Sequence, residues 1–373
     1  MKKIYQKIFI GLFIVPQLLF CLFSSHLNAA SKENRELIDF ESVLQTGLRD
    51  KPEQFKKFYD DHIPFRSYLI NTWNTGIFKV FHEATDDRIV VGKNDGSLAS
   101  TWLFYTLDTE ESPVKQAQGL FQFSDEKMDQ MYQNMLKNQK DMLKENRQLF
   151  YMYCPNKETI YKDMLPDYVK IIDNQTRTQK FSSYLNSQGF TDFVFPVEDL
   201  SETRKNIQNY KKQDTHWNEY GAYVGYCSLI HQLYHGEYDD FANDAQFSST
   251  ENVPIEEDLN NMSGVKNVFL DTAINWSFHD DLKVEETTEK VNTNVQTDTV
   301  CKDAPIDKTL LVIGDSYRTS MIYYLERTFT RCIFMHRDEY EESIIDKVNP
   351  DIIVMESVER YSDANSLKVL RSK

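Results

Sequence analysis

Short apolar runs alternate with amphipathic stretches from residue 148 onward. Runs rich in β-branched and aromatic residues predict strands, whereas apolar positions that recur every three or four residues predict helices. Strands and helices that alternate in this way favour a three-layer α/β/α domain, with one sheet between two layers of helices. The pattern predicts strands at 148–154, 192–196, 309–313, 332–335 and 351–355, and helices at 177–188, 220–234 and 317–329.

A long amphipathic helix is expected before the first of these strands. Ser124 is suited to cap its N-terminus, and the pattern continues to about Arg147. Met128, Met131 and Met135 fall on one face of this helix, at spacings of three and four residues. A methionine stripe of this kind is typical of core packing, because the flexible thioether fills irregular gaps. We therefore assign it no chemistry.

Two regions depart from the alternating pattern. Residues 31–110 indicate an N-terminal region of helices and short strands. Residues 236–305 are rich in Asp, Glu, Asn and Thr, with one strand-like run at 268–270, and we interpret them as an exposed acidic insertion. The domain prediction is a targeting segment at 1–30, an N-terminal region at 31–110 packed on the main domain, and an α/β domain at 111–373 that contains the insertion.

The first thirty residues have the pattern of a targeting segment. Lys2, Lys3 and Lys7 form a basic start, residues 8–23 are apolar, and residues 28–30 are small enough for cleavage. The segment predicts a cleaved signal peptide, with an uncleaved N-terminal anchor as the alternative. In either case we expect an extracytoplasmic protein, either secreted or associated with the cell envelope.

The charge balance limits the partners. The formal net charge is −16, and the basic targeting segment makes the rest of the chain more negative still. Nucleic acids and anionic lipids would be repelled by such a chain, so we expect no nucleic-acid partner. Neutral glycans and cationic groups remain as candidates.

Four cysteines follow the targeting segment, at spacings that match no zinc motif. Two disulfides and a set of buried free thiols are both compatible with the sequence. The four are Cys154, Cys227, Cys301 and Cys332.

The candidate chemistry begins with Gly314-Asp315-Ser316, a turn between a predicted strand and a predicted helix. A serine mounted in this way is exposed to the unpaired N–H groups of the helix start, which favour developing negative charge. The alternative is a plain helix cap. A serine nucleophile needs a base and a group that orients the base, and Asp214-Thr215-His216-Trp217 offers both. In an extended segment Asp214 and His216 would project from one face.

His231 and His235 have the helical spacing of a zinc-binding pair, but no third ligand is evident in the sequence. We therefore expect no metal. The Asp-x-His stretch also has a non-catalytic interpretation, as a pair of polar residues at the surface.

Together the two motifs resemble the alginate O-acetyltransferase-like (DHHW-type) branch of the SGNH hydrolase superfamily. Gly314-Asp315-Ser316 is similar to the serine block of that superfamily, and Asp214-Thr215-His216-Trp217-Asn218 to the signature of this branch. The Asp-x-His pair precedes the serine, which is a circularly permuted motif order relative to ordinary SGNH esterases. Further matches are Glu33-Asn34-Arg35, Asp60-Asp61-His62-Ile63-Pro64-Phe65-Arg66, Val91-Gly92-Lys93, Pro155-Asn156-Lys157 and Glu356-Ser357-Val358-Glu359-Arg360-Tyr361.

The resemblance implies an SGNH-hydrolase-like fold with Ser316 as nucleophile, His216 as base and Asp214 as its orienting group. The amide of Ser316 would be one oxyanion donor, and the second donor is unassigned. Arg337 is the best match to a downstream arginine near the site, and Tyr317 and Trp217 are further candidates for substrate or oxyanion contacts.

The activity implied is O-acetylation of a cell-surface or secreted polysaccharide through an acyl-enzyme. The resemblance also implies a membrane-bound O-acyltransferase as partner, with no cofactor of the chain's own, since the partner or a small donor supplies the acetyl group. Two alternatives stay open: a carbohydrate acetyl-esterase with the same triad, and a non-catalytic glycan-binding or assembly protein on the same fold.

Overall fold

The computed structural model describes residues 38–61, 66–292 and 294–371. The predicted targeting segment, the Glu33-Asn34-Arg35 match and the stretch 62–65 lie outside these residues. Contacts divide the chain into two compact units, which we describe separately. One unit comprises residues up to 86 together with 256–268, and the other comprises 87–255 together with 269–373.

The first unit is helical in the part that the structure describes. Asp39 caps its first helix by accepting a hydrogen bond from the amide of Ser42. Farther along, the amide of Asn74 donates to the carbonyl of Ser263 over 3.0 Å, which joins two helices that are distant in sequence. The helices are α2 (Phe40–Gln45), α3 (Lys51–Asp61), α4 (Arg66–Phe81) and α12 (Asp258–Ser263).

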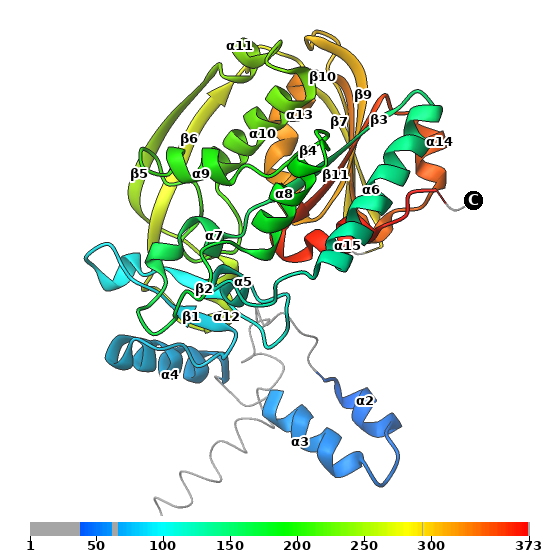
Figure 1. Cartoon of the computed structure of the whole chain (residues 1–373). Helices are drawn as coiled ribbons and strands as arrows, with labels where there is room; N and C mark the ends of the chain where they lie inside the picture. Colours follow the sequence, from blue (N-terminus) through cyan, green and yellow to red (C-terminus); the bar gives the residue numbers. More distant parts are fainter. Residues whose placement is uncertain (1–37, 62–65, 293, 372–373) are drawn as a thin grey trace, which may run out of the picture. The chain divides into compact units, whose positions relative to one another are not determined.

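The second unit is built on a mixed sheet (Figure 1). Within the described residues this sheet has seven strands in the order β4-β3-β11-β9-β10-β8-β7. The first five are parallel to one another, and β8 and β7 continue the sheet in antiparallel pairing. The strands are β3 (Gln148–Cys154), β4 (Phe193–Val194), β7 (Glu285–Val291), β8 (Asn294–Val300), β9 (Ile306–Gly314), β10 (Phe329–His336) and β11 (Ile352–Val358).

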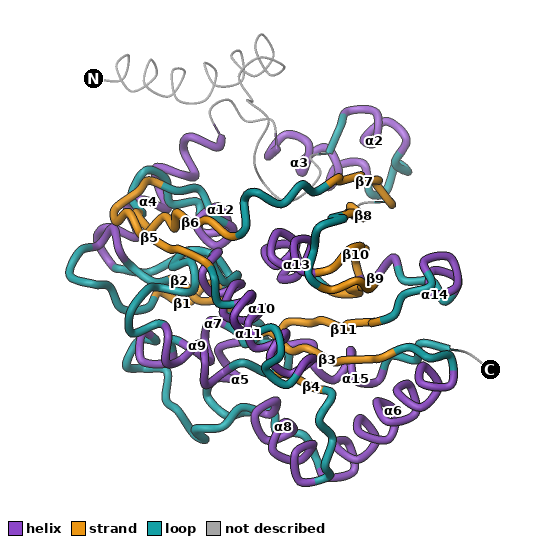
Figure 2. Tube along the Cα trace, turned by 90° about the horizontal axis from the view of Figure 1, so that it is seen from above, coloured by secondary structure: helices purple, strands orange, loops and turns teal. Residues whose placement is uncertain are grey.

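Helices cover both faces of this sheet, as Figure 2 shows from above. Successive side chains along each strand point to opposite faces of the sheet. In β3, for example, Phe150 and Met152 pack into one apolar cluster, and Leu149 and Tyr151 into the other. One face carries α7 (Lys157–Ile160), α9 (Val197–Thr203), α10 (Glu219–Tyr234) and α13 (Ile322–Thr328), and the other α6 (Asp125–Lys144), α8 (Arg177–Ser187), α14 (Ser343–Val348) and α15 (Ser362–Leu367).

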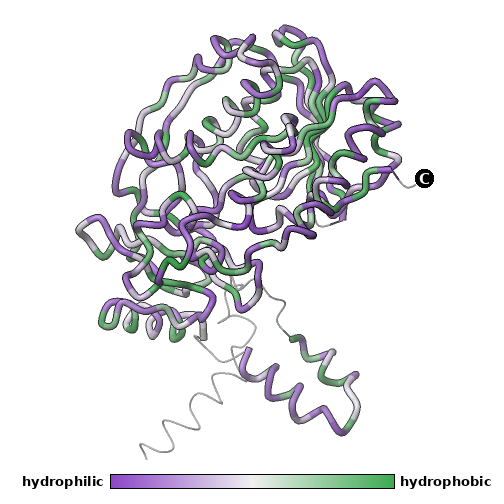
Figure 3. Tube along the Cα trace, in the orientation of Figure 1, coloured by the Kyte–Doolittle hydropathy of each residue, from purple (hydrophilic) through white to green (hydrophobic). Residues whose placement is uncertain are grey.

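The predicted α/β/α architecture is confirmed, and so are the elements that carry it. Ser124 caps α6, and Met131 and Met135 on that helix are fully buried, as expected of a core stripe. The strand β11 is buried along its whole length between β3 and β9, which places it at the centre of the parallel region. Figure 3 shows the apolar residues concentrated along these inner strands.

The acidic insertion is more structured than the sequence predicts. The single strand expected at 268–270 begins at Leu270 and runs to Phe278 as β6, paired with β5 (Ala245–Pro254) in a separate ribbon. In addition, β7 and β8 extend the central sheet. The strand β7 escaped prediction because it is an edge strand with mostly exposed side chains, so its polar composition carries no apolar alternation. The strand β8 escaped prediction because its buried positions are threonines, Thr297 and Thr299.

Two short strands that fall inside the predicted N-terminal region belong by their contacts to the second unit. They are β1 (Ile89–Val91) and β2 (Leu103–Tyr105), which pair antiparallel.

We also find no helix, among the described residues, with the length and apolar character that crossing a membrane requires.

Candidate active site at the carboxyl edge of the sheet

Ser316 follows the carboxyl end of β9, the edge of a parallel sheet at which ligands commonly bind. Its side chain is exposed, although both chain neighbours are buried. The helix predicted at 317–329 is present in two parts: Ser316 opens the 3₁₀ helix η3 (Ser316–Met321), and α13 continues it from Ile322 to Thr328. The tighter first turn is capped by Asp315, whose carboxylate accepts from the amide of Tyr317 over 3.0 Å.

The glycine before this turn is required by a close approach. A Cβ atom added at Gly314 would lie 2.1 Å from a carboxylate oxygen of Glu356 on the neighbouring strand β11. That same oxygen accepts a hydrogen bond from the amide of Asp315 over 2.9 Å. The Gly-Asp step therefore brings the backbone ahead of Ser316 directly against β11.

His216 lies within hydrogen-bond distance of both Ser316 and Asp214. Its Nε2 atom is 2.7 Å from the hydroxyl of Ser316, and its Nδ1 atom is 2.6 Å from Oδ1 of Asp214. Because Nδ1 faces a carboxylate, we assign the ring proton to Nδ1, which leaves Nε2 free to accept from the serine hydroxyl. Asp214 and His216 are mostly buried, whereas Ser316 is open to solvent.

Asp214 contacts His216 through a backbone conformation other than the extended one that the sequence analysis considered. The segment is a turn and not an extended strand. Oδ1 of Asp214 accepts from the backbone amide of His216 over 3.0 Å as well as contacting its ring. Asp forms this kind of local turn readily. Its carboxylate contacts both the backbone amide and the ring of His216, so the imidazole is held without an extended backbone.

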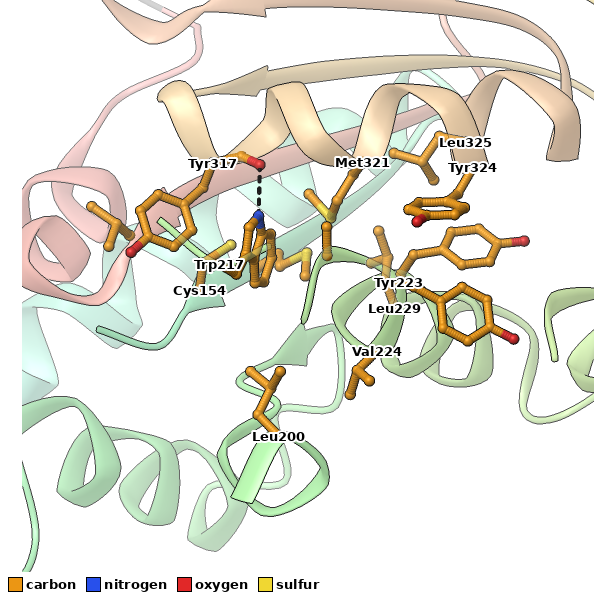
Figure 4. Packing of buried hydrophobic residues seen from close by; sticks show 14 of the residues in the cluster. Cys154, Leu200, Trp217, Tyr223, Val224, Leu229, Tyr317, Met321, Tyr324 and Leu325 are labelled. Carbon is orange, nitrogen blue, oxygen red and sulfur yellow. Dashed lines mark hydrogen bonds between the residues drawn. The ribbon is translucent and has the colours of Figure 1, made fainter. Parts of the chain in front are cut away.

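Trp217 and Tyr317, the chain neighbours of His216 and Ser316, are fully buried and lie side by side in the apolar cluster (Figure 4). The indole Nε1–H of Trp217 donates to the carbonyl of Tyr317 over 3.2 Å, and the two rings are 5.2 Å apart. The hydroxyl of Tyr317 donates in turn to the carbonyl of Thr215. In this arrangement both side chains support the loops of the site, and burial raises the pKa of Tyr317 well above its usual value.

Asp315 connects the serine turn to the strand β11. Its Oδ2 atom accepts from the amide of Val358 over 2.8 Å. Glu356, which meets Asp315 from the same strand, is completely buried, and burial, followed by the nearby Asp315 carboxylate, raises its pKa well above the usual value. The Glu356-to-Tyr361 stretch thus carries partners of the serine turn, a role that the sequence alone did not reveal.

Arg337 lies just past the end of β10, which neighbours β9 in the sheet. Its Nη1 atom is 3.8 Å from Oδ2 of Asp315, and its guanidinium lies over the ring of Tyr361 at 4.4 Å. The structure therefore places this arginine beside the residue that precedes Ser316. Its oxyanion or substrate role stays a prediction, and the second oxyanion donor stays unassigned.

The other candidate ligands of the sequence take different places. Nδ1 of His231 lies 2.7 Å from a carboxylate oxygen of Asp239, and His235 adopts a left-handed conformation at the end of α10. Since His235 leaves the helical path, the two histidines lack the geometry of a helical chelating pair. The four cysteines are free thiols, three of them buried, so the structure favours that alternative over disulfides.

A family model described as the SGNH hydrolase-like domain of the acetyltransferase AlgX matches residues 96–337. No curated protein sequence matches the chain. Among solved structures, PatB1 of Bacillus cereus is similar at a TM-score of 0.55 and 14% identity, with 75% of this chain and 99% of that chain covered. A second PatB1 structure, with a sulfonyl adduct, gives a TM-score of 0.54 at 15% identity, covering 76% and 99%.

A DHHW family protein from Eubacterium siraeum gives a TM-score of 0.54 at 13% identity, covering 78% of this chain and 98% of that chain. At these identities the structural likeness establishes the fold alone.

Proposed function

The chain belongs to the family of SGNH hydrolase-like domains of the acetyltransferase AlgX type, and from this premise we propose that it is an extracytoplasmic O-acetyltransferase. Its acceptor would be a hydroxyl of a cell-surface or secreted polysaccharide. The observation that carries the proposal is that His216 lies within hydrogen-bond distance of both Asp214 and the exposed Ser316.

In the first half-reaction His216 would act as a general base. Nε2 of the imidazole takes the proton of Ser316 while the serine oxygen attacks the acetyl carbonyl. Asp214 stabilises the imidazolium that forms, because its carboxylate holds the Nδ1 proton. The leaving group then departs with the proton from Nε2, and the acetyl group remains on the serine as an ester.

In the second half-reaction the same histidine would activate the sugar. Nε2 takes the proton of a sugar hydroxyl, whose oxygen attacks the acetyl carbonyl of the acyl-enzyme. The serine oxygen leaves and recovers its proton from the imidazolium, so the enzyme returns to its starting state. The amide of Ser316 would be one donor to the oxyanion in both steps.

A membrane-bound O-acyltransferase would supply the acetyl group, and the chain would need no cofactor or metal of its own. The negative net charge supports a neutral glycan over an anionic acceptor, since like charges would repel.

Acetyl-ester hydrolysis by the same residues is the second candidate. The exposure of the Ser316 side chain favours it, because water can reach an acyl group at that position without a conformational change. Transfer and hydrolysis differ only in whether a sugar hydroxyl or water attacks the acyl-enzyme.

The test uses the purified protein with para-nitrophenyl acetate as acetyl donor, with and without oligosaccharides from cell-surface polysaccharides. Mass spectrometry is used to look for an acetyl group on Ser316, and acetate release is compared with acetylation of the sugar. We expect an acetyl-enzyme that transfers to the oligosaccharide. Acetate release unaffected by any acceptor would favour the esterase. Turnover no faster than the uncatalysed background in both wild type and Ser316→Ala would overturn both enzymatic functions in favour of a non-catalytic glycan-binding or assembly protein.

A further inference from the structure

The ammonium group of Lys157 is buried among backbone carbonyls. The residue has no exposed surface, although burial normally disfavours a charged lysine. Its Nζ atom lies 2.5 Å from the carbonyl oxygen of Leu103, 2.9 Å from that of Lys212 and 3.2 Å from that of Lys211. It also donates to the carbonyl of Asp214.

The fold delivers this side chain from the carboxyl end of a central strand. Lys157 follows β3 after Pro155 and Asn156 and is the first residue of α7. From there its side chain extends to the strand β2, where the ring of Phe104 lies 5.3 Å from the ammonium. The ring of Trp102 lies 5.9 Å away, and aromatic faces of this kind favour a buried cation.

The carbonyls that meet at this ammonium belong to the segment that leads into the proposed triad. Residues 211–214 form turns and no regular strand, and among their carbonyls that of Lys212 also accepts from the backbone amide of Leu103 over 3.0 Å. Buried carbonyls that converge on one point repel each other unless a donor lies between them. An ammonium supplies three N–H donors and a positive charge at that point.

One of these carbonyls belongs to Asp214 itself. The backbone of this residue is held on one side by Lys157, and its carboxylate is held on the other side by His216. A shift of the carbonyl would move the carboxylate by a comparable distance, and a displacement of about 1 Å in a catalytic group costs about 10²-fold in rate.

We propose that Lys157 is a positioning residue, which fixes Asp214 relative to His216 and thereby sets the reactivity of Ser316. The inference rests on the proposed serine chemistry. It assigns to the Pro155-Asn156-Lys157 turn a role in the reaction, although Lys157 is connected to Ser316 only through Asp214 and His216.

The test replaces the ammonium with a side chain of similar length and no charge, in Lys157→Met. Lys162→Met is the matched control, because Lys162 is half-buried nearby and its ammonium donates to the carbonyl of Asn174, outside residues 211–214. For each variant we would measure the rate at which phenylmethanesulfonyl fluoride modifies Ser316, kcat and KM for para-nitrophenyl acetate, and the thermal unfolding midpoint.

We expect Lys157→Met to slow sulfonylation and lower kcat, each by about 10²-fold, with KM nearly unchanged. Lys162→Met should keep the wild-type rates and lose less thermal stability, because its ammonium makes one carbonyl contact where that of Lys157 makes four. Should Lys157→Met fail to fold, Lys157→Gln serves instead, because its amide donates to two of the carbonyls without the charge, and a smaller loss in both rates is expected.

A folded Lys157 variant that is sulfonylated at the wild-type rate would overturn the inference and leave the proposed function intact. Wild-type protein that is not modified at Ser316 at all would instead count against the proposed function. The two failures are therefore distinguishable in one set of measurements.

Discussion

The hydroxyl of Tyr317 donates a hydrogen bond to the backbone carbonyl of Thr215. Tyr317 directly follows Ser316, and Thr215 lies between Asp214 and His216, so this bond ties the serine turn to the loop of the histidine. The two segments are a hundred residues apart in the chain, and the indole of Trp217 adds a second bond between them, to the carbonyl of Tyr317. The distance between Ser316 and His216 thus depends on buried groups that never face the solvent.

Removal of the tyrosine hydroxyl should loosen this connection. We expect Tyr317→Phe to fold, to lose about 1 kcal/mol of unfolding free energy, and to show a lower kcat with little change in KM. Tyr324→Phe is the control, because the buried Tyr324 also donates to a backbone carbonyl, that of Glu219, over 2.9 Å. Urea unfolding and steady-state kinetics check both variants. A Tyr317→Phe enzyme with full kcat would show that the bond serves stability alone.

The orienting role that we propose for Asp214 predicts a large effect from a small change. Asp214→Asn keeps the size of the side chain but removes the charge that stabilises the imidazolium, and we expect kcat to fall by about 10⁴-fold. His216→Ala should be at least as damaging, and the double variant should be no worse than His216→Ala, since triad members act as a unit. Additive losses in the double variant would argue against a shared role. Circular dichroism would verify that each variant is folded.

Gly221 in α10 predicts an effect on stability. A Cβ atom at Gly221 would lie 2.0 Å from the carbonyl oxygen of Asn209 and 2.8 Å from Cβ of Trp217. Gly221→Ala should therefore destabilise the protein by about 1–3 kcal/mol, because the helix must move away from the loop that holds Trp217. In contrast, Gly76 in α4 has open space around it, and Gly76→Ala should be neutral or stabilising by up to about 1 kcal/mol. Thermal unfolding midpoints check both variants: the midpoint of Gly221→Ala should fall, and that of Gly76→Ala should stay the same or rise.

Glu356 predicts a pH dependence of stability. Its pKa in the folded protein is raised above the usual 4.5 by burial and by Asp315, so the folded state holds a proton that the unfolded state loses. The contribution of Glu356 to stability is therefore complete below about pH 4.5 and declines as the pH rises toward the folded pKa. A glutamine at this position has no such proton to hold.

We accordingly expect Glu356→Gln to gain stability relative to wild type as the pH rises above about 4.5, by up to about 1 kcal/mol per pH unit. Its amide oxygen can still accept from the amide of Asp315, which keeps the serine turn in place. Urea unfolding of both proteins at several pH values between about 4.5 and 8 measures the difference. A difference that stays constant over this range would contradict the raised pKa.

The inner strands could be predicted from the sequence because they are near-continuous apolar runs buried on both faces, and the long helix because it buries one periodic face. The strand at 148–154 has the bounds of β3, and the helix expected from Ser124 is α6 with that cap. The edge strand β7 could not be predicted, because its side chains are mostly exposed and carry no apolar alternation. The strand β5 is likewise mostly exposed, whereas β6 does carry alternating apolar residues, Ile274, Trp276 and Phe278, a strand signal that the sequence prediction did not use.

By itself the sequence determined the residue types of the site: a serine after an apolar strand, and an aspartate two residues before a histidine. Both motifs are defined by the spacing of residues that are close together in the sequence. Only the tertiary structure decided that Ser316 and His216 meet at 2.7 Å, and which buried groups hold them there. The partners of the two loops, Lys157, Glu356 and Tyr317, act through contacts with backbone atoms of distant segments. Every residue has the same backbone carbonyl and amide, so no sequence pattern records which of them a buried side chain will reach.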